Sequence, residues 1–335
     1  MKKYLALILA LCMVFALCAC GAKEEAPAAA PAAPAAPAEA PAEAEAWAPD
    51  GPVTMIVSYK AGNGTDVTAR ILAQYAEKYI GQTIVIENVD GGSGSIGWSQ
   101  LAAAEADGMT IGFMNLPNFN SSIVKELGTY TTADFTAICN HVTETSLVIV
   151  RADDDRFNTI EDLVAYAKEN NTVASTNGAQ ASNHIGAQAF ARSAGFTYTD
   201  LPQGNTADEL TSLLGGEADW CVAKVADIAG RTDVKVLAAF GPTRVPEHPD
   251  APTLGEVGLY KEWLGSSRCV VAPAGVTEEM VAFYEAAFKA AMEDPAYIEA
   301  AASFATDYKD AATTAALIEQ QQAFTEGLAE GFWFE

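Results

Sequence analysis

The three histidines of the chain are the first candidates for chemistry, but their spacing does not fit a catalytic or metal site. His141, His184 and His248 lie far apart, and the sequence has no H-E-x-x-H, G-x-S-x-G or G-x-x-x-x-G-K-[ST] motif. His184 follows Ser182 by two residues, yet such close neighbours at a helix start rarely form a catalytic triad. We interpret His184 as a hydrogen-bond donor in a cleft or a capping residue, and predict a binding protein without cofactor or metal, not an enzyme.

A polar loop at residues 60–66 is better suited to ligand binding than to catalysis. It joins an apolar strand to a predicted helix, so that free backbone N–H groups and the helix dipole would favour an anion there. Thr65 or Asp66 is expected to cap the helix. An ordinary tight turn is the alternative. The ligand-binding residues predicted in this loop are Ala61, Gly62, Asn63, Gly64, Thr65 and Asp66.

Two further loops follow the next two predicted strands. Residues 90–97 satisfy the G-x-G-x-x-G spacing of dinucleotide-binding proteins. This loop follows the second strand instead of the first, and no acidic strand-end residue stands about 20 positions later, as that fingerprint requires. We therefore expect the rim of a binding cleft, with Gly94 at the ligand. Asn115 begins the third loop and is predicted to contact the ligand too.

The second half of the chain repeats this loop design. Residues 175–184 and 202–206 both run from a strand into a helix and are rich in hydroxyl, amide and glycine groups. Lys60, Lys224 and Arg268 are basic residues at strand or loop ends, where pairing with a second carboxylate and a plain surface charge are both open. The predicted ligand-binding residues of this half are Ser175, Asn177, Gly178, Ala179, Gln180, Ser182, His184, Gln203 and Lys224.

The elements that carry these loops alternate between strands and helices. Strands and helices of this kind, in alternation, indicate α/β domains with mainly parallel sheets, in which ligands bind beyond the carboxyl ends of the strands. Residues 136–150 are expected to hold two short apolar runs. The predicted strands are 53–58, 83–88, 110–115, 172–175, 196–201, 219–225, 234–240 and 269–272. The predicted helices are 66–80, 95–106, 159–169, 183–194, 207–214, 225–231, 278–293, 296–304 and 311–330.

Composition narrows the classes of partner. The chain has 335 residues, 50% of them hydrophobic, which excludes wholesale disorder and suggests about two domains. Its 44 acidic residues outweigh 19 basic ones, for a formal charge of −25. A nucleic-acid partner is therefore excluded, because binding to phosphate backbones needs a basic face.

The N-terminus has the pattern of an export signal. Lys2 and Lys3 precede an apolar run, Tyr4–Leu17, which is too short to span a bilayer comfortably. The following Leu-Cys-Ala-Cys-Gly resembles a lipobox, so we predict a signal peptide at 1–19 and a lipid such as palmitate on Cys20; a plain signal peptide is the alternative. Residues 26–46 contain only Ala, Pro and Glu, which predicts an extended tether within 20–50.

Three cysteines remain in the predicted mature chain: Cys139, Cys221 and Cys269. An odd number gives no disulfide framework, and buried thiols are the simplest interpretation. A Cys139–Cys269 disulfide would require those two strands to lie side by side, which spacing alone does not decide.

Motifs spread over about 52–305 together resemble the substrate-binding receptors of tripartite tricarboxylate transporters, also called Bug receptors. The matching segments include GPVTMIVSYKAGNGTDVTARILA, GQTIVIENVDGGSGSIG, AAAEADGMTIGF, STNGAQASNHIGAQAF, LTSLLGGEADW and APTLGEVGL. The resemblance implies a two-lobed type II periplasmic-binding-protein fold, with mixed, mostly parallel sheets and a two-strand hinge. Lobe 1 would comprise 51–150 and 268–335, and lobe 2 would comprise 151–267.

The resemblance also implies a function. Such a receptor captures a small organic acid, with two loops as pincers on a carboxylate, and passes it to membrane subunits of the transporter. Here the pincers would be Ala61–Asp66 and Ser175–His184, on a monomer anchored by lipid at the outer face of the cytoplasmic membrane or in the periplasm. A sensor subunit that signals to a membrane partner is the alternative.

Three departures leave the ligand open. The family usually has glycine where Asn63 stands, Tyr-Lys-Gly-Gly at 203–206 and Trp-Phe at 267–268. We therefore expect a more polar, less aromatic cleft. Citrate-like, C4-dicarboxylic, aromatic and amino-acid carboxylates all remain candidates.

Overall fold

The computed structural model describes residues 46–178 and 181–330. The predicted signal peptide, lipidated Cys20 and tether lie outside the described residues, as do Ala179 and Gln180. Within the described part, no helix is long and apolar enough to cross a membrane.

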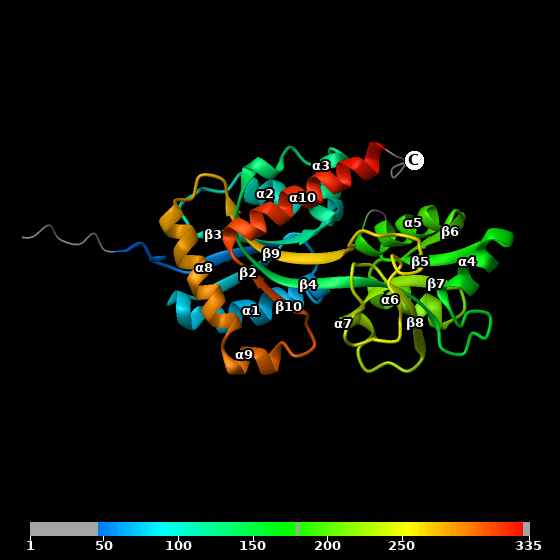
Figure 1. Cartoon of the computed structure of the whole chain (residues 1–335). Coiled ribbons are helices and arrows are strands. Elements are labelled where there is room, and N and C mark those ends of the chain that lie inside the picture. Colours follow the sequence, from blue (N-terminus) through cyan, green and yellow to red (C-terminus); the bar gives the residue numbers. More distant parts are fainter. Residues whose placement is uncertain (1–45, 179–180, 331–335) are drawn as a thin grey trace, which may run out of the picture. The chain divides into compact units, whose positions relative to one another are not determined.

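One long strand, β4 (Phe135–Arg151), belongs to two sheets. Its first part pairs with β9 (Gly265–Pro273) as far as Thr145, and from Ser146 it pairs with β7 and β8. We call the elements around the first sheet lobe 1 and those around the second lobe 2; Figure 1 shows β4 and β9 running between them. The predicted lobe limits, 150/151 and 267/268, fall inside these two strands.

The sheets are mixed, with parallel strands at their outer sides. In the first sheet β1 pairs in parallel with β2 and β3, whereas β9, β4 and β10 are antiparallel to their neighbours. In the second, β5 pairs in parallel with β6 and β7. The remaining strands are β1 (Val53–Val57), β2 (Ile84–Asn88), β3 (Thr110–Leu116), β5 (Thr172–Thr176), β6 (Tyr198–Pro202), β7 (Trp220–Lys224), β8 (Val234–Ala239) and β10 (Thr306–Lys309).

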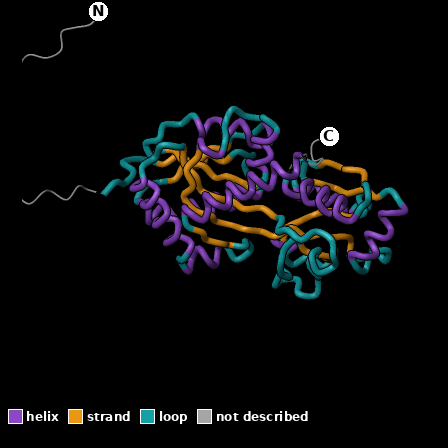
Figure 2. The backbone as a smooth tube through the Cα atoms, turned by 45° about the horizontal axis from the view of Figure 1, so that its top comes forward, coloured by secondary structure: helices purple, strands orange, loops and turns teal. Residues whose placement is uncertain are grey.

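Helices flank the strands of both sheets (Figure 2). Their apolar residues recur at helical spacing, as in α4, which buries Ile160, Leu163 and Ala167 and begins with a capping box between Thr159 and Asp162. The helices are α1 (Gly64–Ile80), α2 (Ser95–Ala102), α3 (Asn118–Val124), α4 (Ile160–Glu169), α5 (Ser182–Ala194), α6 (Thr206–Leu214), α7 (Val225–Ile228), α8 (Glu278–Met292), α9 (Pro295–Ala300) and α10 (Ala311–Glu330).

Successive strand residues pack into cores on opposite faces of the first sheet. Met55 belongs to the core beneath α1 and α8, and Ile56 belongs to the core that contains Trp98 and Phe119. The same alternation separates Cys139, in the first core, from Cys269, in the second. Their strands do lie side by side, but both thiols are free. A Cys139–Cys269 disulfide is therefore not formed, because the two side chains face opposite ways.

The two short apolar runs within 136–150 belong to a single continuous strand, β4. The polar residues between them resembled a break, yet the strand continues, and Asn140, His141 and Glu144 are buried within it. Asn140 Nδ2 donates to the carbonyl oxygen of Asp307 at 2.6 Å, and the His141 ring is hydrogen-bonded to Tyr297. Polar residues can continue a buried strand when each finds a partner.

Two elements escaped prediction because both are short and polar. Helix α3, with sequence NFNSSIV, lacks the length and the apolar period of a typical helix; it is held by Phe119 and by a hydrogen bond between Ser122 and Tyr130. Strand β10 has the sequence TDYK and pairs with β4. Helix α9 ends at Ala300, short of the predicted residue 304.

Candidate ligand-binding site

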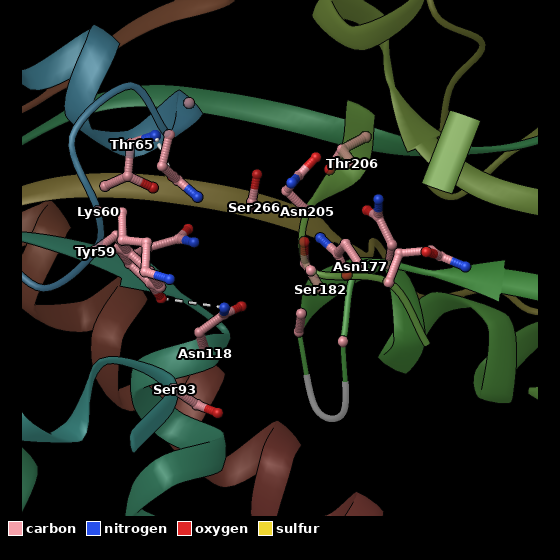
Figure 3. A pocket seen from close by; sticks show the side chains of 18 of the residues that line it. Tyr59, Lys60, Thr65, Ser93, Asn118, Asn177, Ser182, Asn205, Thr206 and Ser266 are labelled. Atoms are coloured by element: carbon pink, nitrogen blue, oxygen red, sulfur yellow. Dashed lines mark hydrogen bonds between the residues drawn. The ribbon is translucent and has the colours of Figure 1, made fainter. Parts of the chain in front are cut away.

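A cleft of about 870 Å³ lies between the two lobes, within the size range of small-ligand sites. Figure 3 shows Tyr59, Lys60, Thr65 and Asn118 on one side of it, opposite side chains from lobe 2. From lobe 1 it is lined by Tyr59, Lys60, Ala61, Gly62, Asn63, Gly64, Thr65, Asp90, Ser93, Asn115, Asn118, Ser122, Leu127, Ser266 and Arg268. From lobe 2 it is lined by Asn177, Gly178, Ala181, Ser182, Asn183, Gln203, Gly204, Asn205, Thr206, Ala207, Asp208, Lys224 and Asp227.

The loop at residues 60–66, which we call the first loop, presents the N-terminus of α1 to the cleft. Asn63 is the N-cap, and its Oδ1 accepts a hydrogen bond from the Thr65 backbone N–H at 2.8 Å. The prediction that Thr65 or Asp66 caps the helix was wrong, because both lie inside the first turn. The backbone N–H groups of this first turn point along the helix axis and form the positive end of the helix dipole.

Asp66 supports the first loop from below and does not line the cleft. Its carboxylate is 2% exposed and accepts hydrogen bonds from Gly62 N at 2.8 Å, Arg70 Nε at 3.0 Å and Asn88 Nδ2 at 2.8 Å. Burial favours the neutral acid, but these donors outweigh it and lower the pKa of Asp66. The carboxylate therefore stays ionised and fixes the position of the loop.

The facing wall consists of the loops that follow β5 and β6. Gly178 has φ +109°, a conformation that residues with a side chain rarely adopt, and a Cβ atom there would lie 3.4 Å from the carbonyl oxygen of Gln203. Ser182 begins α5, and Asn205 caps α6 by accepting the Asp208 backbone N–H at 3.0 Å. The N-termini of α5 and α6 thus face the cleft opposite α1. Three helix ends with free N–H groups suit an anionic ligand.

The cleft floor is a network of charged and amide side chains that are buried or half-buried. It comprises Glu144, Asn183, Glu209, Lys224, Asp227 and Arg268. Lys224 Nζ donates to Asn183 Oδ1, and Asn183 Nδ2 donates to Glu209 Oε2 at 2.8 Å. Burial lowers the pKa of Lys224, while burial raises the pKa values of Glu209 and Asp227. Burial therefore opposes the charge of each of these three groups.

Arg268 and Glu144 form an ion pair in the floor. Arg268 Nη1 lies 2.8 Å from Glu144 Oε2, with the two side chains 14% and 2% exposed. Both residues stand on the strands that connect the lobes. Their charges neutralise each other where water is largely excluded.

Tyr59 and two asparagines give the lobe 1 wall a neutral, polar part. Burial raises the pKa of Tyr59 to about 12, so the phenol stays protonated, and its oxygen accepts Asn118 Nδ2 at 3.1 Å. The Oδ1 atoms of Asn115 and Asn118 are buried, and neither has a partner among the described residues. These oxygens can accept hydrogen bonds from a ligand.

The comparisons with known proteins identify the family. Residues 68–330 match the family described as tripartite tricarboxylate transporter family receptor. The chain belongs to this family. It is 30% identical over 291 residues to a UPF0065 protein from the TAR-I ttuE–ttuC′ intergenic region of Agrobacterium vitis, with 84% of each chain covered.

Solved structures of receptors give the same fold. A TctC solute binding protein from Polaromonas superposes with a TM-score of 0.73 at 26% identity, covering 85% of this chain and 99% of that one. The periplasmic binding protein BugD gives a TM-score of 0.73 at 28% identity, covering 84% and 97%. The predicted family and the predicted α/β periplasmic-binding-protein fold are confirmed. Like its relatives, this receptor has the fold of a substrate-binding protein.

Most of the residues that were predicted to bind the ligand, and that the structure describes, line the cleft. Its lining includes Ala61, Gly62, Asn63, Gly64, Thr65, Asn115, Asn177, Gly178, Ser182, Gln203 and Lys224. Gly94, Ser175 and His184, like Asp66, do not line it. The absent side chain of Gly94 leaves room for the Trp98 ring, and Ser175 Oγ donates to the Glu209 carbonyl oxygen at 3.0 Å.

His184 lies beneath the wall of lobe 2. Its Nε2 is 3.0 Å from Gln188 Nε2 and 3.8 Å from Asp200 Oδ2. Burial lowers the pKa of His184, and Asp200 opposes that shift. The ring thus contacts Gln188 and Asp200 of lobe 2. No group of three or more potential metal ligands occurs within residues 46–178 and 181–330.

Sequence reasoning identified the loop 202–206 but assigned only Gln203 of it to the ligand, and it missed the acidic members of the cleft floor. Asn205, Thr206 and Asp208 carried a detectable signal, since an Asn three residues before an Asp is a capping pattern. Glu144 and Glu209 carried no such signal, because they stand inside a strand and a helix, where a solvent-exposed charge would give the same sequence pattern.

A second cavity, of about 470 Å³, lies beside Trp263 and Phe324.

Proposed function

We propose that this receptor is a lipid-anchored extracytoplasmic protein that captures a small organic carboxylate between its lobes. It then delivers the acid to the membrane subunits of a tripartite tricarboxylate-type transporter, acting as a monomer. The observation that carries the proposal is the position of three helix N-termini, of α1, α5 and α6, around one polar cleft. Their N–H groups supply short hydrogen bonds to a carboxylate, which a chain of charge −25 would otherwise repel.

Lobe closure would be the working step. The first loop and the residues Asn177, Gly178 and Ser182 stand on opposite walls, and β4 and β9 connect the two lobes. A carboxylate bound to both walls would hold them together, and the transporter would recognise that closed form.

A thermal-shift screen tests the binding step. The protein, unfolded and refolded to remove any acid carried over from the cell, is heated with citrate, succinate, benzoate or glutamate. At 100 times its dissociation constant, a ligand stabilises the fold by about 2.7 kcal/mol, which raises Tm by several degrees. We expect a shift with one small set of these acids. No shift with any carboxylate would contradict the proposed function.

Two glycines provide a matched pair of variants. Gly178→Ala and Gly195→Ala both place a side chain at a positive φ, +109° and +75°, but only Gly178 lines the cleft. We expect Gly178→Ala to abolish the ligand-induced shift and Gly195→Ala to retain it, even if both lower the basal Tm.

Anchoring and delivery need their own measurements. Cys20→Ser should release the protein from the membrane fraction, since a lipid on that cysteine is the proposed anchor. Uptake of the identified acid should require both the receptor and the membrane subunits. Binding without any such uptake would favour a sensor subunit instead.

A further inference from the structure

Arg268 extends from β9 to the cleft with one edge of its guanidinium group unused. On β9 it lies opposite Asn115 of β3 and Val142 of β4, at the junction between the two lobes. Its Nη1 is taken by Glu144, at 2.8 Å. Its Nε is buried and has no hydrogen-bond partner in the described part of the chain. A buried guanidinium N–H without a hydrogen-bond acceptor lowers the stability of the protein, so an acceptor at this atom would be favourable.

The other nitrogen of that edge is directed to the first loop. Arg268 Nη2 lies 3.7 Å from the position that a Cβ atom of Gly64 would occupy. Gly64 lines the cleft and begins α1, so a guanidinium cation stands beside the positive end of a helix dipole. Two positive ends side by side repel each other unless an anion lies between them.

The neighbouring charges leave that position to the ligand. Glu144 already has Arg268 Nη1, Asp66 is held by Gly62, Arg70 and Asn88, and Asp90 lies 3.7 Å from Lys60. Asp227 also lines the cleft and attracts Arg268, but its Oδ2 accepts the Lys224 backbone N–H at 2.8 Å. The acceptor geometry that matches the Nε–Nη2 edge is a carboxylate bound by two parallel hydrogen bonds.

We propose that Arg268 binds a second carboxylate of the ligand through Nε and Nη2, so that the receptor selects small dicarboxylates over monocarboxylates. This inference rests on the proposed function, and it assigns the other carboxylate to the helix N-termini of lobe 2. Glu144 is a positioning residue, because it orients the guanidinium through Nη1. A two-ended acid would then connect the walls, whereas an acid with one carboxylate would leave Arg268 Nε without an acceptor.

Calorimetric titration of the full chain with matched acids tests this. Succinate is compared with succinamate, and glutarate with glutaramate, which have the same length but one carboxylate replaced by an amide. Hydrogen bonds to charged groups contribute about 1.5–3 kcal/mol, so the wild type should bind at least one diacid roughly 10- to 150-fold more tightly than its monoamide.

Two variants assign the preference to Arg268. Arg268→Lys keeps the charge opposite Glu144 but removes the planar fork, and should lower the diacid-to-monoamide ratio at least tenfold. Arg268→Met combined with Glu144→Gln removes both charges together, avoids leaving Glu144 unpaired, and should bring the ratio close to one. The control, Arg244→Met, removes a half-exposed arginine that pairs with Glu256 outside the cleft lining, and should leave the ratio within about twofold of wild type.

The outcomes separate the two proposals. If monoamides or monocarboxylates bind as tightly as the diacids in the wild type, the role of Arg268 is wrong while the carboxylate receptor stands. An unchanged ratio in both Arg268 variants would overturn it as well. If no carboxylate binds at all, the proposed function fails together with this inference.

Discussion

The first loop and the cleft floor contribute different kinds of groups to the same cleft. The first loop presents backbone N–H groups at the start of α1, and Lys60, its cationic side chain, is 81% exposed. In the floor the charges themselves are buried: Lys224 is 4% exposed and Glu144 is 2% exposed. A backbone array depends on the path of the chain, whereas a buried charge network depends on the identity of each side chain. Substitutions should therefore be tolerated in the loop and costly in the floor.

The largest expected effect is at Glu144. Glu144→Ala leaves the Arg268 guanidinium without its ion-pair partner where water is largely excluded, which should lower the free energy of unfolding by about 3 kcal/mol. Urea unfolding measures this loss. Glu144→Gln is the control, since its amide oxygen can still accept a hydrogen bond and should reduce the loss. A cost below about 0.5 kcal/mol for Glu144→Ala would remove the contrast between floor and loop.

Asp66 is the exception that sharpens the contrast, because it is a buried charge beneath the loop. Asp66→Ala removes the acceptor of Gly62 N, Arg70 and Asn88, and should lower the free energy of unfolding by about 2 kcal/mol and weaken carboxylate binding. Asp162→Asn, in the capping box of α4 outside the cleft lining, should lower stability without changing affinity. Full binding by Asp66→Ala at a temperature where it is folded would show that the loop does not depend on this support.

The stability of the protein should depend on pH through the buried carboxyl group of Glu209. Burial raises the pKa of Glu209, so the folded protein keeps a proton that the unfolded chain loses above about pH 4.5. This contribution to stability is complete below pH 4.5 and is lost as the pH rises to the folded-state pKa. The Glu209→Gln variant lacks this pH-dependent contribution. Its free energy of unfolding relative to wild type should therefore increase from pH 5 to pH 8, by at most about 1.4 kcal/mol per pH unit.

Urea unfolding of both proteins at each pH measures that difference. Glu217→Gln makes the same substitution at an exposed glutamate outside the cleft lining and is the matched control. A constant difference between Glu209→Gln and wild type over this range would mean that Glu209 is ionised in the folded protein.

The smallest effect is expected at Lys60. Its Nζ lies 3.7 Å from Asp90 Oδ2, and the two side chains are 81% and 46% exposed. Exposed ion pairs contribute little, so Lys60→Ala should change the free energy of unfolding by less than about 0.5 kcal/mol. A change as large as that of Glu144→Ala would contradict the division between the two regions.

The same division explains how much of the site could be predicted. The first loop is contiguous, so its residue types and its position between a strand and a helix indicated an anion site directly. Only its cap was misassigned, because Asn63, Thr65 and Asp66 are all good capping residues and the sequence does not choose among them.

The floor brings together residues from β4, α5, α6, β7, α7 and β9, so no local pattern could describe it. Lys224 and Arg268 were noticed as basic residues at strand or loop ends, but Glu144 and Glu209 were not, because their partners are distant in sequence. The fold was more accessible, since alternating apolar runs and a family resemblance both indicated it. The continuity of β4 was not evident, because the polar Asn140, His141 and Glu144 separate its two apolar runs and find their partners only once the sheet is assembled.

The most direct test of the account is the structure of the receptor crystallised with the acid that gives the largest thermal shift. The account predicts carboxylate oxygens within about 2.7–3.2 Å of backbone N–H groups in the first loop or of Arg268 on one wall, and of groups at the α5 or α6 N-terminus on the other. A ligand that contacts one wall alone, or that occupies the smaller cavity beside Trp263 and Phe324, would contradict it.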